Sequence, residues 1–192
     1  RSDHDRQPGR DHLSRLRLIN ANRATLTTGT PIGSNGALEG YRVEGGSIRS
    51  EGAGLDTRQT DYTDLIARAV EINAGLWANT LKISAGANEV NAEHTQATPI
   101  TASSAAPAYA IDVAQLGGMY ASKIMLVGTE AGIGVRNAGQ IGAAAGEVIV
   151  STDGRLHNSG HIDSTGTTRI DTRSGIDNSG TIYAQGDLAL ST

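Results

Sequence analysis

Two histidines and an aspartate that could bind a metal ion stand close together in the stretch HNSGHID, as His157, His161 and Asp163. Imidazole nitrogens and carboxylate oxygens are ligands of zinc, which takes three or four of them converging on one point. The chain of 192 residues holds five His and no Cys, and no third His lies near this pair. Whether these side chains form a site therefore depends on the pattern in which they stand.

The stretch belongs to a unit that occurs three times, at intervals of 21 and 20 residues. Each unit opens on Asn-small-Gly, has Ile two residues later, then a second Gly, and closes on a strand with alternating side chains. Gly and Asn tolerate a positive φ and mark corners, whereas apolar alternation marks a strand with one buried face. The expected corner residues are Asn137, Gly139, Asn158, Gly160, Asn178 and Gly180. The expected core residues are Ile141, Ile162, Ile182, Val148, Val150, Ile170, Leu188 and Leu190.

The flanking units argue against a metal site at the two histidines. Arg136 and Asp177 stand where the middle unit has His157. Gln140 and Thr181 stand where it has His161. These are solvent-facing residue types with no ligand chemistry in common, so we expect neither a metal ion nor another cofactor.

The acidic residues of the same region suggest a different chemistry. Polysaccharide lyases and hydrolases built on β-helices use carboxylates aligned across coils, together with cations that stabilise developing charge. Asp163, however, stands at the same position as Gly142 and Tyr183, so no carboxylate ladder forms there. We expect no catalytic residues. A β-helical carbohydrate-active enzyme is the alternative function, and a groove lined by Asp163, Asp171 and Arg169 would favour it.

Repetition of this kind predicts the fold. A unit of about 20 residues cannot bury its apolar face alone, but stacked copies can, each adding one strand spacing of ~4.7–4.9 Å. We therefore predict an all-β, right-handed parallel β-helix in which stacked corner Asn side chains form a hydrogen-bonded ladder. A looser copy of the corner, with Asn73 and Gly75, extends the pattern towards the N-terminus. At this unit length the chain allows roughly eight coils.

Two stretches depart from the pattern. Residues 61–73, DYTDLIARAVEIN, fit either a short helix with Asp61 as its N-cap or an alternating strand, and the sequence leaves both open. Residues 91–110 are rich in Ala, Ser, Thr and Pro and lack periodicity. They predict a long loop, an excursion outside the helix.

Composition limits the classes of function. With 25 Gly, one Trp and no Phe, the core must come from Val, Ile, Leu and Ala, which suits a narrow β architecture. A net charge of -4 and the lack of a basic stripe argue against nucleic-acid binding. No apolar run approaches the roughly 18 residues of a membrane span. Residues 1–18, with five Arg and three Asp, lack the apolar region of a signal peptide and predict a disordered or non-native leader.

Longer stretches carry a family resemblance. They are INANRATLTTGTP (19–31), YRVEGGSIRSEGAGLDTRQTDYTDLIARAVEINAGLWANTLKISAGANEVN (41–91) and PAYAIDVAQLGGMYASKIMLVGTEAGIGVRNAGQI (107–141). They resemble the secretion domain of filamentous-haemagglutinin-type two-partner secretion exoproteins, a group that includes large adhesins and contact-dependent growth inhibition exoproteins. The resemblance spans about residues 19–192 and implies a secretion (haemagglutination activity) domain at 19–131, followed by haemagglutinin-type repeats at 132–192.

The resemblance also implies a function. Such a domain crosses the inner membrane and is then recognised by the periplasmic domains of a dedicated outer-membrane β-barrel transporter. It serves to export and present an adhesin or toxin-delivery shaft, secreted or on the bacterial cell surface, without ATP, cofactor or enzymatic residues. Residues 41–91 are the stretch expected to serve transporter recognition and shaft nucleation.

The chain departs from the family before residue 19. The signal peptide, the N-terminal cap and an Asn-Pro-Asn loop of family members have no counterpart in the leader. Receptors on host or neighbouring cells would be contacted by parts beyond residue 192. For that reason the sequence leaves open whether the exoprotein is an adhesin or a growth-inhibition toxin.

Overall fold

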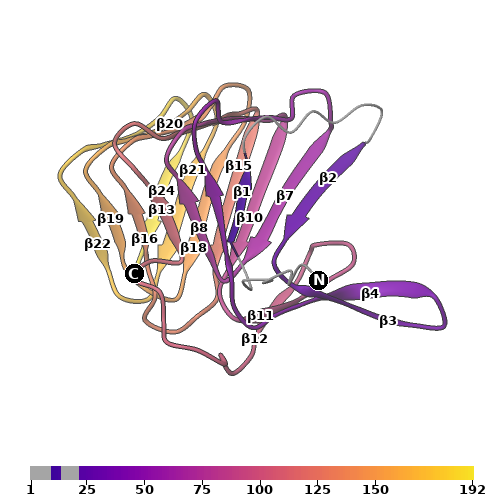
Figure 1. Cartoon of the computed structure of the whole chain (residues 1–192). Helices are drawn as coiled ribbons and strands as arrows, with labels where there is room; N and C mark the ends of the chain where they lie inside the picture. The colour runs from indigo at the N-terminus through magenta and orange to yellow at the C-terminus, as the bar shows by residue number, and fades with distance from the viewer. Residues whose placement is uncertain (1–9, 14–21) are drawn as a thin grey trace.

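The computed structural model describes residues 10–13 and 22–192, which form a parallel β-solenoid of about seven turns. This confirms the predicted fold class. Each complete turn passes through three strands, one in each of three parallel sheets that run along the solenoid (Figure 1). Because two excursions take residues out of the coils, the chain completes fewer turns than the eight expected from its length. None of the described residues belongs to a helix long and apolar enough to cross a membrane.

The strands of each turn come in a fixed order, from sheet 1 to sheet 2 to sheet 3. Sheet 1 holds β1 (Arg10–Leu13), β5 (Ser47–Ser50), β8 (Ala69–Ile72), β13 (Ile111–Val113), β16 (Val135–Asn137), β19 (Leu156–Asn158) and β22 (Ile176–Asn178). Sheet 2 holds β6 (Leu55–Asp56), β9 (Gly75–Trp77), β14 (Gly118–Ala121), β17 (Gln140–Ala143), β20 (His161–Ser164) and β23 (Thr181–Ala184). Sheet 3 holds β2 (Arg23–Thr27), β7 (Tyr62–Ala67), β10 (Thr80–Ala85), β15 (Lys123–Gly128), β18 (Val148–Thr152), β21 (Thr168–Thr172) and β24 (Leu188–Ser191).

A fourth sheet, the side sheet, lies outside the solenoid and is antiparallel. Its strands, in spatial order, are β12 (Ala97–Pro99), β11 (Asn88–Asn91), β4 (Ala37–Val43) and β3 (Thr30–Ser34). The first excursion, between β2 and β5, contributes β3 and β4, and the second, between β10 and β13, contributes β11 and β12. The β3–β4 hairpin projects from one corner of the solenoid (Figure 1). The unperiodic stretch 91–110 thus begins at the end of β11 and forms an excursion outside the helix, and β12 is the one strand that lies wholly within it among the described residues.

The core is a narrow column of aliphatic side chains between the three parallel sheets. Five of the expected core residues are fully buried, namely Ile141, Ile162, Val148, Val150 and Ile170. Ile182 is only partly buried. Leu188 and Leu190 stand in register with the buried Thr168 and Ile170, yet they are 47% and 50% exposed. Both lie on β24, which has β21 on one side and no described strand on the other.

The corner asparagines form the predicted ladder. Asn137 donates from Nδ2 to Asn158 Oδ1 at 2.8 Å, and Asn158 donates to Asn178 Oδ1 at 2.7 Å. Asn73 also lies at a corner, between β8 and β9, but not in this ladder. Strand register places Ile72 beside Val113 and Val113 beside Asn137, so that Asn73 falls one residue out of line and is exposed. Gly75 is correspondingly aligned with Gln140 through Gly118.

The ambiguous stretch 61–73 forms β7 and β8, so the strand alternative is the one observed. The stretch also fitted a helix because β7 is buried on both faces and lacks the polar alternation of a half-buried strand. Leu65 points into the solenoid core, whereas Ile66 points outward and packs with Val43 and Val90 of the side sheet. Of the predicted leader, residues 10–13 form β1, which pairs with β5, and residues 1–9 and 14–18 lie outside the described residues.

Candidate functional site

The structure separates the two histidines of HNSGHID. His157 lies on β19 of sheet 1 and His161 on β20 of sheet 2, on either side of a corner. The Nδ1 atom of His157 is 3.3 Å from Asp177 Oδ2, while Asp163 accepts a hydrogen bond from Gln140. Within the described residues, no three His, Asp or Glu side chains come together in a way that could hold a metal ion.

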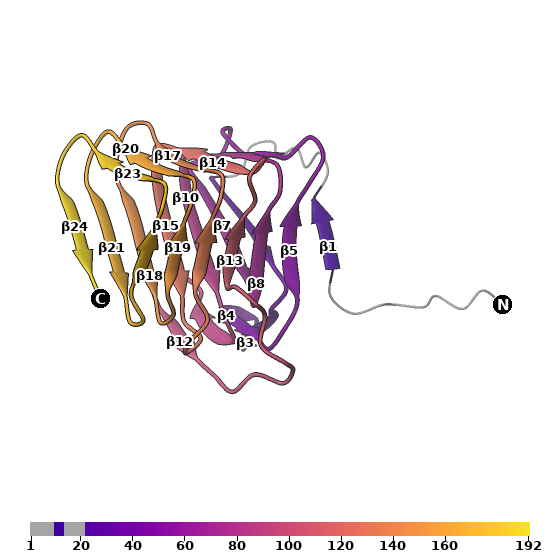
Figure 2. The ribbon, with the colours of Figure 1, turned by 90° about the vertical axis from the view of Figure 1, so that its left-hand side faces the viewer.

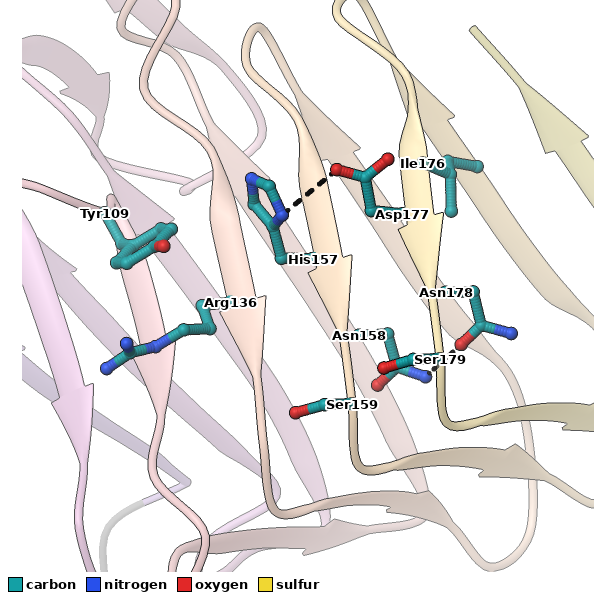
Figure 3. A pocket seen from close by; sticks show the side chains of 9 residues that line it. All are labelled: Tyr109, Arg136, His157, Asn158, Ser159, Ile176, Asp177, Asn178 and Ser179. Atoms are coloured by element: carbon teal, nitrogen blue, oxygen red, sulfur yellow. Dashed lines mark hydrogen bonds and ion pairs between the residues drawn. The ribbon is translucent and has the colours of Figure 1, made fainter.

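A hollow of about 640 Å³ lies over His157 on the outer face of sheet 1 (Figure 3). It is lined by Tyr109, Arg136, His157, Asn158, Ser159, Ile176, Asp177, Asn178 and Ser179. Tyr109 comes from the end of the second excursion, and its ring meets His157 edge-on at 6.0 Å between centroids. The guanidinium of Arg136 lies 4.8 Å from the centre of the same ring.

The charged groups around this hollow already pair with one another. Strand register places Asp112, Arg136, His157 and Asp177 side by side in one outward row. Arg136 binds Asp112 through two hydrogen bonds of 2.8 and 2.6 Å, which raise the pKa of the guanidinium. Opposite charges on adjacent strands stabilise their pairing in register. The row therefore serves the stacking of coils.

The carboxylates proposed for an enzyme do not converge. Asp163 lies on sheet 2, whereas Asp171 and Arg169 lie together on β21 of sheet 3. Arg169 donates to Asp171 at 2.8 Å, and this bond, followed by one from Ser191, lowers the pKa of Asp171. A carboxylate held ionised in this way is unsuited to act as a general acid. A second acidic group with an oppositely shifted pKa would be needed, and none is found among the described residues near it.

Sequence reasoning missed a buried polar cluster between sheet 3 and the second excursion. Asp64 of β7 is 3% exposed and His94 is 5% exposed. The Oδ2 atom of Asp64 lies 3.2 Å from His94 Nδ1 and 3.3 Å from Arg23 Nη1. Lys82 donates to the backbone oxygen of His94, and burial lowers the pKa of Lys82. The only sequence signal was an Asp at an outward position of an apolar strand.

A buried ion pair ties the same excursion to the solenoid. The side chain of Arg68 is 5% exposed and donates to Glu130 at 2.8 and 3.1 Å. Arg68 also donates to the backbone and hydroxyl oxygens of Ser104 in the excursion. Hydrogen bonding to Arg68 lowers the pKa of Glu130 and raises that of Arg68. Together with the contact of Val43 and Val90 on Ile66, these clusters hold the side sheet in place.

The candidate functional site is therefore the side sheet, a surface without an enclosed centre. Its outer face carries exposed charges, with Arg42 pairing with both Glu44 and Glu89. Its outermost strands, β3 and β12, each have only one partner among the described strands. A free strand edge offers backbone donors and acceptors to another protein chain.

Comparison with known proteins finds clear relatives. The model of the family described as "TPS secretion domain" matches residues 13–158. The chain is 54% identical over 171 residues to "Toxin CdiA" of Yersinia pestis, covering 88% of this chain and 5% of that protein. It is 52% identical over 145 residues to "tRNA nuclease CdiA-2" of Burkholderia pseudomallei (strain 1026b), covering 75% and 5%. The chain thus spans about 5% of the length of these curated relatives.

A solved structure is also similar. The filamentous haemagglutinin secretion domain superposes with a TM-score of 0.67 at 27% sequence identity. The match covers 89% of this chain and 59% of that chain.

Proposed function

Because this chain belongs to the TPS secretion domain family, we propose that it directs the export of a large exoprotein through a dedicated outer-membrane transporter. The family implies such a transporter as a partner in general terms. The route would lead through the periplasm to the cell surface or the medium. In this role the chain works by being recognised and by folding, so no cofactor or catalytic group is required of it.

Recognition is assigned to residues 41–91, and one structural observation supports this choice. The two ends of the stretch pair with each other, since β4 and β11 are neighbours in the side sheet, with Val43 opposite Asn88. Two complete turns, β5 to β7 and β8 to β10, lie between them. The stretch thus closes on itself and presents an exposed sheet on its outside. A closed unit of this kind also suits the nucleation of further coils, which stack on nearest neighbours.

For the parent exoprotein, we propose a contact-dependent toxin of the CdiA type in preference to an adhesin. The identity of 54% to a protein named "Toxin CdiA" is twice that to the filamentous haemagglutinin domain, at 27%. The nuclease activities in relatives' names are not assigned to this segment. Receptors on host or neighbouring cells would be contacted by parts outside it. We propose residues 131/132 as the border between secretion domain and repeats, because the regular spacing begins there, although the family model matches as far as residue 158.

The transporter's periplasmic domains provide the direct test. The chain, carrying an added N-terminal signal peptide, is produced in cells with and without the cognate transporter, and its amount in the medium is measured. We expect release only with the transporter, and retention of the chain by the immobilised periplasmic domains. Release that does not depend on the transporter, together with no retention, would contradict the proposal.

A matched pair of variants tests the side sheet. The double variant Arg42→Ala with Glu89→Ala removes an exposed ion pair from the outer face of the side sheet. Arg169→Ala with Asp171→Ala removes an exposed ion pair from sheet 3 in the repeats. Exposed pairs contribute only about 0–1 kcal/mol, so both variants should fold. Retention by the periplasmic domains should weaken in the first alone, and equal retention of both would place recognition elsewhere.

A further inference from the structure

The outer face of sheet 2 is built differently from the rest of the solenoid. Strand register places two outward rows along it. One row reads Gly75, Gly118, Gln140, His161 and Thr181. The row beside it reads Asp56, Trp77, Tyr120, Gly142, Asp163 and Tyr183. Two aromatic rings and two glycines thus lie on β9 and β14, and Gln140, His161 and Asp163 bring hydrogen-bonding groups on β17 and β20.

Trp77 and Tyr120 form an aromatic platform on adjacent strands. Their ring centroids are 6.1 Å apart, and their planes differ by only 18°. The rings reach back over glycines, because a Cβ at Gly75 would lie 2.2 Å from Trp77 Cη2, and one at Gly118 would lie 2.6 Å from Tyr120 Oη. The absence of side chains beneath them lets both rings lie close to the sheet. Tyr120 is 41% exposed, so the platform is open to solvent.

Polar groups border the platform on its C-terminal side. Next to Tyr120 stands Gly142, which leaves a notch in the row. Gln140 donates to Asp163 beside that notch, and a Cβ at Gly142 would lie 3.4 Å from Asp163 Oδ2 and 3.8 Å from Gln140 Nε2. His161, exposed, adjoins Gln140 on the next strand. The remaining hydrogen-bonding capacity of Gln140 and Asp163, together with the imidazole of His161, therefore lies on the strands next to the aromatic platform.

We propose that this face binds a neutral saccharide. A pyranose ring has an apolar face of C–H groups, whose slight positive charge suits the negative face of an aromatic ring. Its rim of hydroxyl groups suits Gln140, His161 and Asp163 as partners. A nucleic acid or an acidic polymer is disfavoured, because Arg58 at the edge of this face is already bound to Asp56 through two hydrogen bonds of 2.9 and 2.6 Å.

Although Trp77 belongs to residues 41–91, the platform lies on a different face of the solenoid from the side sheet. In Figure 2, the strands of sheet 2 from β14 to β23 lie at the top of the solenoid and the side sheet lies at the bottom. Figure 1 likewise shows β20 at the top of the solenoid and the side sheet at the bottom. A saccharide on sheet 2 would leave the side sheet accessible.

The single Trp of the chain makes the test direct, because intrinsic tryptophan fluorescence reports on the platform itself. The whole chain is titrated separately with three neutral oligosaccharides: tetra-N-acetylchitotetraose, cellotetraose and maltotetraose. At least one of them should change the Trp77 emission in a saturable way. No saturable change with any of the three oligosaccharides, at concentrations of up to roughly 10 mM, overturns the proposal.

Variants then assign the binding to the platform. Tyr120→Ala should raise the Kd, measured by calorimetry, about tenfold, because one stacking contact is lost. Gly118→Ala keeps both aromatic residues but displaces the Tyr120 ring, and should weaken binding likewise. Tyr62→Ala is the matched control, since Tyr62 is 47% exposed but lies on sheet 3. An unchanged Kd in Tyr120→Ala and Gly118→Ala, with folding verified by circular dichroism, overturns the assignment.

Discussion

Replacing Asn158 by Ala tests the idea that the asparagine ladder stabilises the stack. Asn158 is 2% exposed and stands in the middle of the three ladder residues. Its amide accepts from Asn137 at 2.8 Å and donates to Asn178 Oδ1 at 2.7 Å and to the backbone oxygen of Thr181 at 3.2 Å. The substitution removes these three bonds and a longer one, of 3.4 Å, from Nδ2 to the backbone oxygen of Gly160, and it leaves the corner backbone in place.

The expected loss can be worked from these contacts. Each hydrogen bond contributes a net ~0.5–1.5 kcal/mol. Two of the groups that lose Asn158 as a partner can still form hydrogen bonds. Asn137 donates to the backbone oxygen of His161 at 3.1 Å, and Asn178 is exposed to water. We therefore expect the free energy of unfolding to fall by about 2 kcal/mol, and the Tm by roughly 4–8 °C for a chain of this size.

Asn73→Ala is the matched control, since Asn73 likewise opens an Asn-small-Gly tripeptide but is exposed and out of register with the ladder. It should cost less than about 0.5 kcal/mol, as surface substitutions usually do. Urea unfolding followed by circular dichroism measures both values. Equal losses in the two variants would refute the reasoning, because the effect would then belong to the local turn and not to stacking between coils.

Three further outcomes are expected. In Glu130→Gln, the free energy of unfolding should fall less steeply on acidification than in the parent chain. Bonding to Arg68 lowers the folded pKa of Glu130 below its ordinary value of 4.5. The contribution of Glu130 to stability is therefore present above that value and is lost as the pH falls through the folded pKa. Urea unfolding across that range measures this, and parallel curves would contradict it. Val43→Asp buries a charge against Ile66 and should release the side sheet, seen as faster hydrogen exchange in β4 and β11 with β18 protected as before. His157→Ala should lower the Tm by no more than about 2 °C and leave a calorimetric zinc titration unchanged. Zinc binding that is seen in the parent chain and absent from His157→Ala would instead support a metal site.

The repeated part of the fold could be predicted because its signals are local. The inward positions of Ile141 and Ile162 follow from corner spacing and alternation alone. Leu188 and Leu190 occupy the matching inward positions of β24, but their burial depends on a neighbouring coil. The stretch 61–73 was ambiguous for a related reason, since the side sheet covers the outer face of β7 and removes the polar alternation that identifies a strand.

The candidate site was far less accessible to sequence reasoning. Asp64 meets His94 and Arg23 only because an excursion folds back over sheet 3, and no spacing rule links residues so far apart. Arg68 and Glu130 are likewise joined across a long stretch of chain. The sequence by itself determined the unit length, the corners and the aliphatic core, because each arises from backbone preferences within one coil. Tertiary structure alone decided which coils align, as Asn73 shows, and which outward polar groups are buried, because stacking register and excursion packing depend on contacts between distant residues.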